Sequence, residues 1–253
     1  MHDPKVPAWP PKSAPRLFVE QVLDRHARVE IDGNAAHYLA RVMRVKPGDA
    51  VILCDNLTGE WATRVADAGK RAVSLEVLER LRELEEVPDL WLCPALLKKD
   101  RFDLVLEKAT ELGAARIQPV IMRRCVADKL NLDRARTLTT EAAEQCARTA
   151  LPELAEPVKL DTLLREWPKD RVVFFADEEG GEPAAKAFAR HTGPAAILVG
   201  PEGGFDTAER GTIRDHPQAR PVSLGPRILR GETAAIAALS VWMALAGDWP
   251  AKE

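Results

Sequence analysis

The sequence has few cysteines, and they form no recognisable pattern. All four lie far apart along the 253 residues, without a C-x-x-C pair: Cys54, Cys93, Cys125 and Cys146. Zinc sites and disulfide frameworks depend on closely spaced or multiply paired cysteines. We therefore expect buried, reduced thiols and no metal centre.

Long hydrophobic runs are also missing. The longest apolar stretch, residues 234–247, is interrupted by Ser240 and is shorter than the roughly 20 residues that a membrane-spanning helix needs. The first residues lack the apolar core of a secretory signal. We expect a protein of the cytoplasm, with a buried helix at 234–247 and no membrane association.

An overall excess of positive charge is absent, because 36 lysines and arginines stand against 39 acidic residues. This balance argues against a protein that coats nucleic acid non-specifically. The charge is uneven, however: residues 76–89 are acidic and read as a solvated linker, whereas residues 91–150 carry more bases than acids. A local phosphate-contacting face is therefore compatible with the composition.

The pattern of short and long segments predicts two domains after a proline-rich start. Residues 1–15 contain five prolines and are expected to form a flexible or weakly docked arm. Residues 16–84 show short apolar runs and a turn at 56–59, which predict a small β-rich domain. One helix is expected there, with Asn34 as N-cap and an apolar stripe of Ala36, Leu39, Ala40 and Met43.

Residues 85–253 alternate between strand and helix patterns. Continuous apolar runs predict strands near 90–96, 117–121, 172–176, 197–199 and 222–224. Helices are expected after an Asp100 cap up to Gly113, and near 134–149, 183–190, 207–214 and 232–245. Alternation of this kind is typical of an α/β domain whose parallel sheet is covered on both faces.

Two glycine-bearing bends follow predicted strands in this second domain. One is Gly200-Pro201-Glu202-Gly203-Gly204, before a helix capped by Asp206, and the other begins at Gly225-Pro226. Each bend alone could simply start a helix. Together, at the carboxyl ends of strands, they could form opposite walls of a ligand pocket. The pattern is neither G-x-G-x-x-G nor a Walker motif, which disfavours a dinucleotide or nucleoside triphosphate.

From about Arg16 onward the sequence resembles the 16S ribosomal RNA (uracil-N3) methyltransferases of the SPOUT superfamily. The matching stretches are HYLARVMR at 37–44, KATELG at 108–113, EAAEQCAR at 141–148, ILVGPEGG at 197–204 and LGPRILRGETAAIAAL at 224–239. The family commonly has threonine or alanine where this chain has Gly231, which is expected to alter the helix start slightly.

The resemblance implies a PUA-like β-barrel RNA-binding domain, followed by a SPOUT parallel sheet with a C-terminal trefoil knot, in a homodimer. It also implies S-adenosylmethionine as cofactor, no metal, and 16S ribosomal RNA of the small subunit as partner. The residues expected around the cofactor are Phe175, Ala176, Asp177, Leu198, Val199, Gly200, Pro201, Glu202, Gly203, Gly204, Leu224, Gly225, Ile228, Leu229, Arg230 and Thr233. A valine at Gly203 is expected to occupy cofactor space.

Four residues are the catalytic candidates: Glu144, Gln145, Arg148 and Arg230. Glu144 and Arg148 are four positions apart and share a helix face, so they could form a simple ion pair. Functionally, Arg148 could steady the uracil oxygen or a phosphate, and Glu144 could accept the N3 proton. The expected RNA contacts are Arg16, His37, Arg41, Arg44, Lys98, Lys99, Arg101, Arg123 and Arg124, although each could also be an ordinary surface charge.

Two other functions remain open at this point. The chain could be a non-catalytic RNA-binding factor in ribosome assembly, with a decayed cofactor pocket. It could also be a SPOUT methyltransferase that acts on transfer RNA or on a ribose hydroxyl. The glycine bends favour an enzyme, and the stretches at 37–44 and 141–148 favour the ribosomal substrate.

Overall fold

The structure is a computed structural model that describes residues 9–69 and 71–249. Contacts divide the chain into two compact units. The first comprises the chain up to Glu86 together with Ala143–Ala150, and the second comprises Val87–Ala142 and the chain from Leu151 onward. Residues 143–150, which the sequence pattern assigns to the second domain, therefore make most of their contacts with the first unit.

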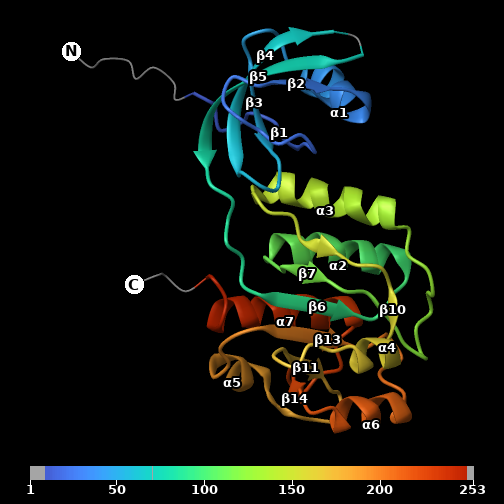
Figure 1. The fold of residues 1–253 in the computed structure, drawn as a ribbon. Helices are drawn as coiled ribbons and strands as arrows, with labels where there is room; N and C mark the ends of the chain where they lie inside the picture. The colour runs from blue at the N-terminus through green and yellow to red at the C-terminus, as the bar shows by residue number, and fades with distance from the viewer. Residues whose placement is uncertain (1–8, 70, 250–253) are drawn as a thin grey trace. The chain divides into compact units, whose positions relative to one another are not determined.

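The first unit is a five-stranded sheet with one short helical segment (Figure 1). Its strand order is β1-β3-β4-β5-β2, and all pairs are antiparallel except β1 with β3. Its elements are β1 (Arg16–Phe18), β2 (Arg28–Ile31), α1 (Gly33–His37), the π-helix η1 (Tyr38–Met43), β3 (Ala50–Cys54), β4 (Glu60–Ala68) and β5 (Val73–Arg82).

The hydrophobic core of this unit explains the alternating pattern of its strands. Alternate residues of β2 and β5 point inward, and they pack with β3 and with Leu39 of η1, which is fully buried. The sequence pattern missed β2 and β4 as strands. It also placed Met43 in the apolar stripe, but Met43 is 38% exposed because the helix changes to π-helical turns and shifts its inward face. The helix begins two residues earlier than expected, after an Asp32 cap that lacks a side-chain hydrogen bond.

The predicted turn at 56–59 is held by one buried carboxylate. Oδ1 of Asp55 accepts hydrogen bonds from the amides of Leu57 and Thr58, and Oδ2 accepts one from the amide of Leu23. Burial acts to raise the pKa of Asp55, but the hydrogen bonds to its ionised form have the larger combined effect. The pKa of Asp55 is therefore below its usual value. The turn is therefore tied to the start of the unit.

Part of the proline-rich arm contacts the first unit. The first eight residues lie outside the described residues. The guanidinium of Arg64 lies 5.5 Å from the ring centroid of Trp9, and the carbonyl of Pro15 accepts a hydrogen bond from the amide of Ile52. The flexibility of residues 1–15 and the domain boundaries at 84 and 85 stay predictions.

The second unit contains a seven-stranded, wholly parallel sheet in the order β12-β14-β11-β13-β6-β7-β9, and a small β10-β8 pair. Its strands are β6 (Leu90–Pro94), β7 (Arg116–Ile117), β8 (Val120–Ile121), β9 (Glu153–Leu154), β10 (Val158–Lys159), β11 (Val172–Ala176), β12 (Glu182–Pro183), β13 (Ala195–Val199) and β14 (Ala219–Ser223). Its helices are α2 (Lys99–Glu111), α3 (Leu132–Cys146, ending among first-unit residues), α4 (Leu160–Arg165), α5 (Ala184–Ala189), α6 (Thr207–Asp215) and α7 (Gly231–Leu245). The expected α/β class is confirmed.

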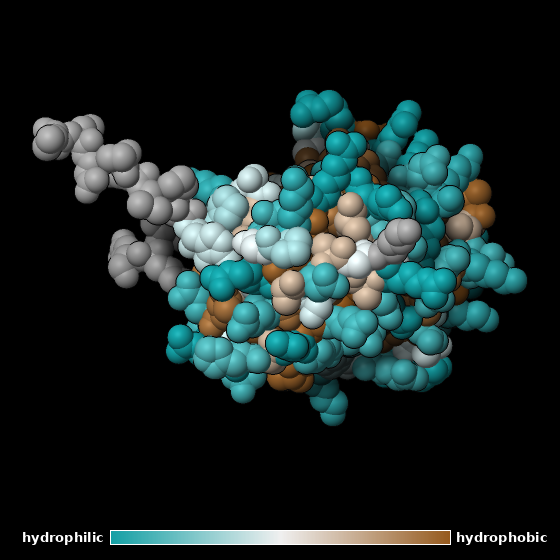
Figure 2. All heavy atoms as spheres, turned by 90° about the horizontal axis from the view of Figure 1, so that it is seen from above, coloured by the Kyte–Doolittle hydropathy of each residue, from teal (hydrophilic) through white to brown (hydrophobic). Residues whose placement is uncertain are grey.

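Helices cover both faces of this sheet, as the apolar strands predict. In β13, Ile197 packs in a core with α2, α5 and α7, while its neighbour Leu198 packs in the opposite core with α4 and α6. This alternation is the reason why the strand is apolar at every position. On the face shown in Figure 2, hydrophobic residues appear as separate small areas between hydrophilic ones.

Two predicted helix caps and one predicted strand can be compared with the structure. Asp206 caps α6 and accepts a hydrogen bond from the Ala208 amide, as expected. Lys98, not Asp100, is the cap residue of α2. The expected strand at 117–121 is two short strands, β7 and β8, because Pro119 has no N–H to continue the ladder.

Candidate functional site

A cavity of about 360 Å³ lies at the carboxyl ends of three adjacent strands, β11, β13 and β14. Because parallel strands end at the same edge, the segments that leave them converge there. The lining residues are Ala176, Asp177, Glu178, Val199, Gly200, Pro201, Glu202, Gly203, Gly204, Val222, Ser223, Leu224, Gly225, Pro226, Arg227, Ile228, Leu229, Gly231 and Ala234. All belong to the second unit.

Glycine is required at two positions of the cavity wall. Gly204 has a φ of +67°, and a β carbon there would lie 2.3 Å from Oε1 of Glu178. Gly225 has a φ of +113°, which side chains rarely adopt, although open space surrounds it. These positions keep the main chain bare where it faces the cavity.

Gly203 plays a different part from the expected one. A β carbon at this position would meet the side chain of Arg124 at 3.4 Å. The extra methyl groups of a valine would first press on that arginine, so the expectation that they would occupy cofactor space has no direct geometric support. Gly204 is the better position at which to disturb the cavity.

Twelve of the sixteen residues expected around a cofactor line this cavity: Ala176, Asp177, Val199, Gly200, Pro201, Glu202, Gly203, Gly204, Leu224, Gly225, Ile228 and Leu229. Phe175 and Leu198 do not, because strand alternation directs both side chains into the opposite core. Arg230 and Thr233 are exposed at the start of α7 and are not part of the lining. Binding of a cofactor by any of these residues stays a prediction.

Seven lining residues were not among those sixteen: Pro226, Arg227 and Gly231 lie within the second expected bend, and Glu178, Val222, Ser223 and Ala234 flank the expected segments. A signal for most of them was available, since they immediately continue segments already expected at the site. Ala234 follows Arg230 by one helical turn on α7, so its position depends on how that helix packs.

An ionic cluster braces the wall that follows β11. The carboxylate of Asp177 is fully buried and contacts Nη2 of Arg214 at 2.7 Å and Nε of Arg210 at 3.2 Å. Arg210 also pairs with Glu178 and Glu179, and its own side chain is only 9% exposed. The hydrogen bond to Asp177 raises the pKa of Arg214. The carboxylate of Asp177 is thus engaged by α6.

Three arginines expected to contact RNA instead contact the cavity loop or the start of α6. Arg101 pairs with Glu202 at 3.3 Å, and Arg124 donates a hydrogen bond of 2.8 Å to the carbonyl of Gly203. Arg123 pairs with Asp206 at 2.9 Å. The backbone hydrogen bond from Ala208, followed by the charge of Arg123, lowers the pKa of Asp206. These cations hold residues 202–206 in place.

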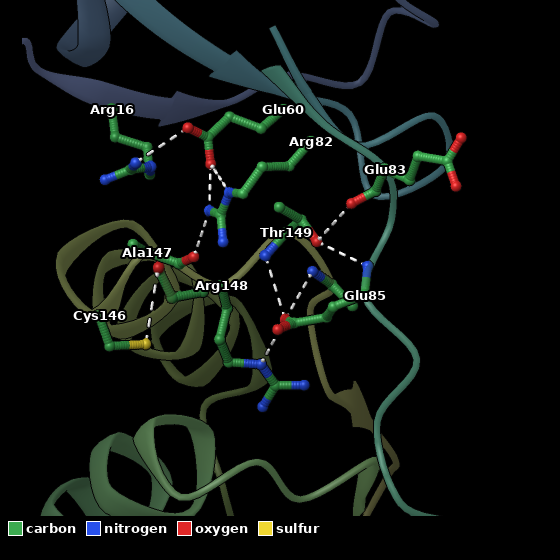
Figure 3. A network of polar contacts seen from close by, with 11 residues as sticks. Arg16, Glu60, Arg82, Glu83, Glu85, Cys146, Ala147, Arg148 and Thr149 are labelled. Carbon is green, nitrogen blue, oxygen red and sulfur yellow. Dashed lines mark hydrogen bonds and ion pairs between the residues drawn. The ribbon is translucent and has the colours of Figure 1, made fainter. Parts of the chain in front are cut away.

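The expected catalytic pair lies among residues of the first unit. Arg148 is 5% exposed, and its Nε lies 3.2 Å from Oε1 of Glu85 (Figure 3). The same oxygen accepts hydrogen bonds from the amides of Thr149 and Ala150. Oε1 of Glu144 accepts a hydrogen bond of 2.8 Å from the Phe18 amide. Both side chains therefore help to attach residues 143–150 to this unit.

A second group in Figure 3 reinforces that attachment. Glu60 is 4% exposed and pairs with Arg16 at 3.1 Å and also with Arg82. Arg82 donates a hydrogen bond of 2.7 Å to the carbonyl of Ala147. Arg16, expected to contact RNA, is thus engaged within the protein, and the sequence pattern missed Glu60, Arg82 and Glu85.

The other expected residues are exposed. Gln145 lies on the outer side of α3, and Lys98 and Lys99 begin α2. His37, Arg41 and Arg44 are exposed on α1 and η1 or at their end. Over residues 9–69 and 71–249, no helix is long and apolar enough to cross a membrane, and no cluster of histidine, cysteine or acidic residues could hold a metal.

The chain matches two protein families. The model of the RNA methyltransferase domain matches residues 85–243, and that of the RNA methyltransferase PUA domain matches residues 31–78. The chain is similar to ribosomal RNA small subunit methyltransferase E of Mycobacterium bovis, with 31% identity over 93% of each chain. The protein of the same name from Bacillus subtilis is 30% identical over 89% of this chain and 94% of its own length.

A solved structure has the same fold over nearly its full length. It is a ribosomal RNA small subunit methyltransferase E from Neisseria gonorrhoeae bound to S-adenosylmethionine. It superposes with a TM-score of 0.85, at 28% identity, over 93% of this chain and 99% of the other. The family resemblance found in the sequence, including its PUA domain, is confirmed by these matches.

Proposed function

Because this chain belongs to the RNA methyltransferase family, we propose that it transfers the methyl group of S-adenosylmethionine to N3 of a uridine in 16S ribosomal RNA. The observation that carries this proposal is the cavity at the ends of β11, β13 and β14, walled by bare main chain and apolar side chains. The relatives named for ribosomal RNA methylation align along nearly the whole chain, which supports a ribosomal substrate over transfer RNA.

The cavity suits S-adenosylmethionine in size and chemistry. Its volume of about 360 Å³ falls within the usual range for small-molecule sites. Gly204 and Gly225 leave the main chain uncovered by side chains toward the adenine edge, and Leu224 and Leu229 offer apolar surface to its faces. Glu178 and Glu202 also line the cavity, each paired with an arginine.

The bound cofactor would supply an electrophilic methyl group. The protein must then orient the uracil, exclude water and remove the N3 proton. Alignment of two reacting atoms alone can contribute about 7–11 kcal/mol to lowering a barrier. Arg230, exposed directly after the cavity loop, is our candidate to steady the charge on the base.

Arg148 and Glu144 remain catalytic candidates, with Gln145 beside them. Arg148 contacts Glu85 and Glu144 contacts the Phe18 amide, so both residues have a structural role whether or not they act in catalysis. A catalytic part requires an effect on methyl transfer beyond the effect on stability.

The finer architecture is also part of the proposal. A C-terminal trefoil knot and a homodimer follow from the family resemblance, and a substrate in the small ribosomal subunit implies action in the cytoplasm. Ile228 supports a partner surface beside the cavity, because it is 95% exposed on the loop that lines it. Sedimentation of the purified chain at twice the mass of one chain is the expected result, and a monomer at micromolar concentration would contradict the dimer.

The cavity assignment is tested with two glycine variants. Gly204→Ala forces a β carbon against Glu178 at a φ of +67°, so we expect at least ten-fold weaker S-adenosylmethionine binding in calorimetry. Gly211→Ala is the matched control, because its β carbon on α6 meets nothing within 4 Å. Equal affinity of the two variants for S-adenosylmethionine would show that the wall at Gly204 is not part of the cofactor site.

The substrate is tested by mass spectrometry of small-subunit RNA methylated in vitro by the purified protein. We expect one N3-methyluridine in the 16S RNA of unmodified subunits. Methylation of transfer RNA alone would favour the transfer RNA enzyme. An absence of both binding heat and methylation would favour the non-catalytic assembly factor.

A further inference from the structure

The π-helix η1 carries an exposed aromatic ring among unpaired positive charges. Tyr38 is 38% exposed, and Val42 and Met43 beside it are 64% and 38% exposed. Tyr38 is also the single tyrosine of the chain. The opposite side of the same segment, Leu39, is fully buried. The segment therefore exposes an aromatic and apolar face to solvent, while Leu39 anchors it in the core.

The charges around this face differ from those of the other arginines expected to contact RNA. Among the described residues, neither Arg41 nor Arg44 forms an ion pair or side-chain hydrogen bond, and both are exposed. Arg16, Arg82, Arg101, Arg123, Arg124 and Arg148, by contrast, all have protein partners. Two free guanidinium groups beside a free aromatic ring thus mark this surface as available for an anionic ligand.

The backbone of the segment is also unusual. A π-helix is rare and often occurs at functional sites. It ends at Arg44, which adopts a φ of +54°. Glycine would adopt this conformation without strain. The chain instead places an arginine side chain at this end of the face.

We propose that Tyr38 is a stacking platform for one unpaired RNA base, with Arg41 and Arg44 contacting the flanking phosphates. Bases stack on exposed aromatic side chains, whereas bases within a duplex are covered by their neighbours. Free guanidinium groups meet the charge of the RNA backbone. Val42 and Met43 extend the apolar contact area. The proposal deepens the proposed function, because it names how the first unit holds the RNA.

The single tyrosine makes a direct test possible. Protein produced with 3-fluorotyrosine gives one fluorine NMR resonance, which reports Tyr38 alone. We expect a ten-nucleotide single-stranded RNA of mixed sequence to shift this resonance, and a fully paired duplex to shift it far less. An unchanged resonance at a saturating RNA concentration, verified by fluorescence anisotropy, would overturn the proposal. An equal shift with the duplex would also overturn it, by indicating phosphate contact without stacking.

Binding variants provide the second measurement. Base stacking is worth about 1–3 kcal/mol for each base, which corresponds to a loss of roughly five- to 150-fold in single-strand affinity for Tyr38→Ala. Tyr38→Phe keeps the ring and should bind within two-fold of the unchanged protein. Since Tyr38 is exposed, both variants should fold normally, which circular dichroism checks. Equal binding by Tyr38→Ala and Tyr38→Phe would refute stacking.

This test is separable from that of the proposed function. S-adenosylmethionine binding depends on the second unit and should be the same in both Tyr38 variants. If Tyr38→Ala methylates small-subunit RNA at a normal rate, the stacking proposal fails and the proposed function stands. If the unchanged protein shows the fluorine shift without methylating ribosomal RNA, the proposed function fails and the stacking proposal stands.

Discussion

At the scale of single residues, partners separate the arginines of this chain into two groups. One group neutralises buried or partly buried carboxylates, as Arg148 does with Glu85 and Arg210 does with Asp177. The other group, which includes Arg41 and Arg44, has no such partner among the described residues. Residue type alone does not distinguish them, because a guanidinium suits a carboxylate and a phosphate equally well.

The part played by Arg148 can be separated from that of its partner. Glu85→Gln and Arg148→Lys weaken the same contact, the first by removing the charge on Glu85 and the second by removing the guanidinium. Each should lower the free energy of unfolding by about 1–3 kcal/mol, since a hydrogen bond to a charged group is weakened. If Arg148 acts in catalysis, only Arg148→Lys should also reduce single-turnover methylation of small subunits, by 100-fold or more. Equal rates in the two variants at a temperature where both are folded would leave Arg148 with a structural part alone.

Arg210 offers a second test at this scale. It connects Asp177, Glu178 and Glu179, so Arg210→Gln should leave Glu178 and Glu179 without their cation, and Asp177 with Arg214 alone. We expect the KM for S-adenosylmethionine to rise about ten-fold while kcat changes little, because the wall shifts but no reacting atom is touched. The opposite pattern, a lowered kcat with an unchanged KM, would contradict this positioning part. Arg190→Gln, which removes an exposed pair with Glu182, is the control.

At the scale of elements, one side chain fixes the connection between two strands of the first unit. The turn at 55–59 depends on Asp55, whose carboxylate accepts four hydrogen bonds, including one from the Thr58 hydroxyl at 2.7 Å. That hydroxyl in turn accepts a hydrogen bond from Nε1 of Trp61. One ionised group thereby organises the connection between β3 and β4.

This turn should make the first unit sensitive to acid. The folded pKa of Asp55 is lowered from 3.8, so the stability it contributes is fully present above about pH 4 and is lost as the pH falls through the folded value. Asp55→Asn removes this dependence, and its stability deficit at pH 7 should shrink on acidification. Denaturant titrations at pH 7 and pH 3, followed by tryptophan fluorescence, measure the difference. A deficit that stays constant between the two values would contradict the assignment.

At the scale of the whole molecule, the net charge of −3 conceals an uneven supply of free cations. Most of the arginines expected to contact RNA form an ion pair or a hydrogen bond within the protein. The exposed cations without such partners include Arg41, Arg44, Lys98 and Lys99. The affinity for RNA should therefore fall only moderately as the salt concentration rises.

Salt titrations test this distribution of charge. Each phosphate contact adds about 0.7 to the slope of log affinity against log salt for a single strand. The double variant Arg41→Gln, Arg44→Gln should accordingly lower the slope by about 1.4. Arg123→Gln, which loses a pair with Asp206, should leave the slope unchanged. An equal reduction by the two sets would refute the division between free and engaged cations.

The sequence by itself determined the α/β class, the β-rich first unit and the two glycine bends, because these depend on local periodicity and on backbone freedom. Val172–Ala176 and the Asp206 cap illustrate this, since neighbours in the chain decide both. Only the tertiary structure decided which side chains face the cavity. Leu198 and Val199 are adjacent and equally apolar, yet they enter opposite sides of the sheet. It also placed Arg148 beside Glu85, 63 residues away, since an ion pair depends on distance in space and leaves no periodic trace in the chain.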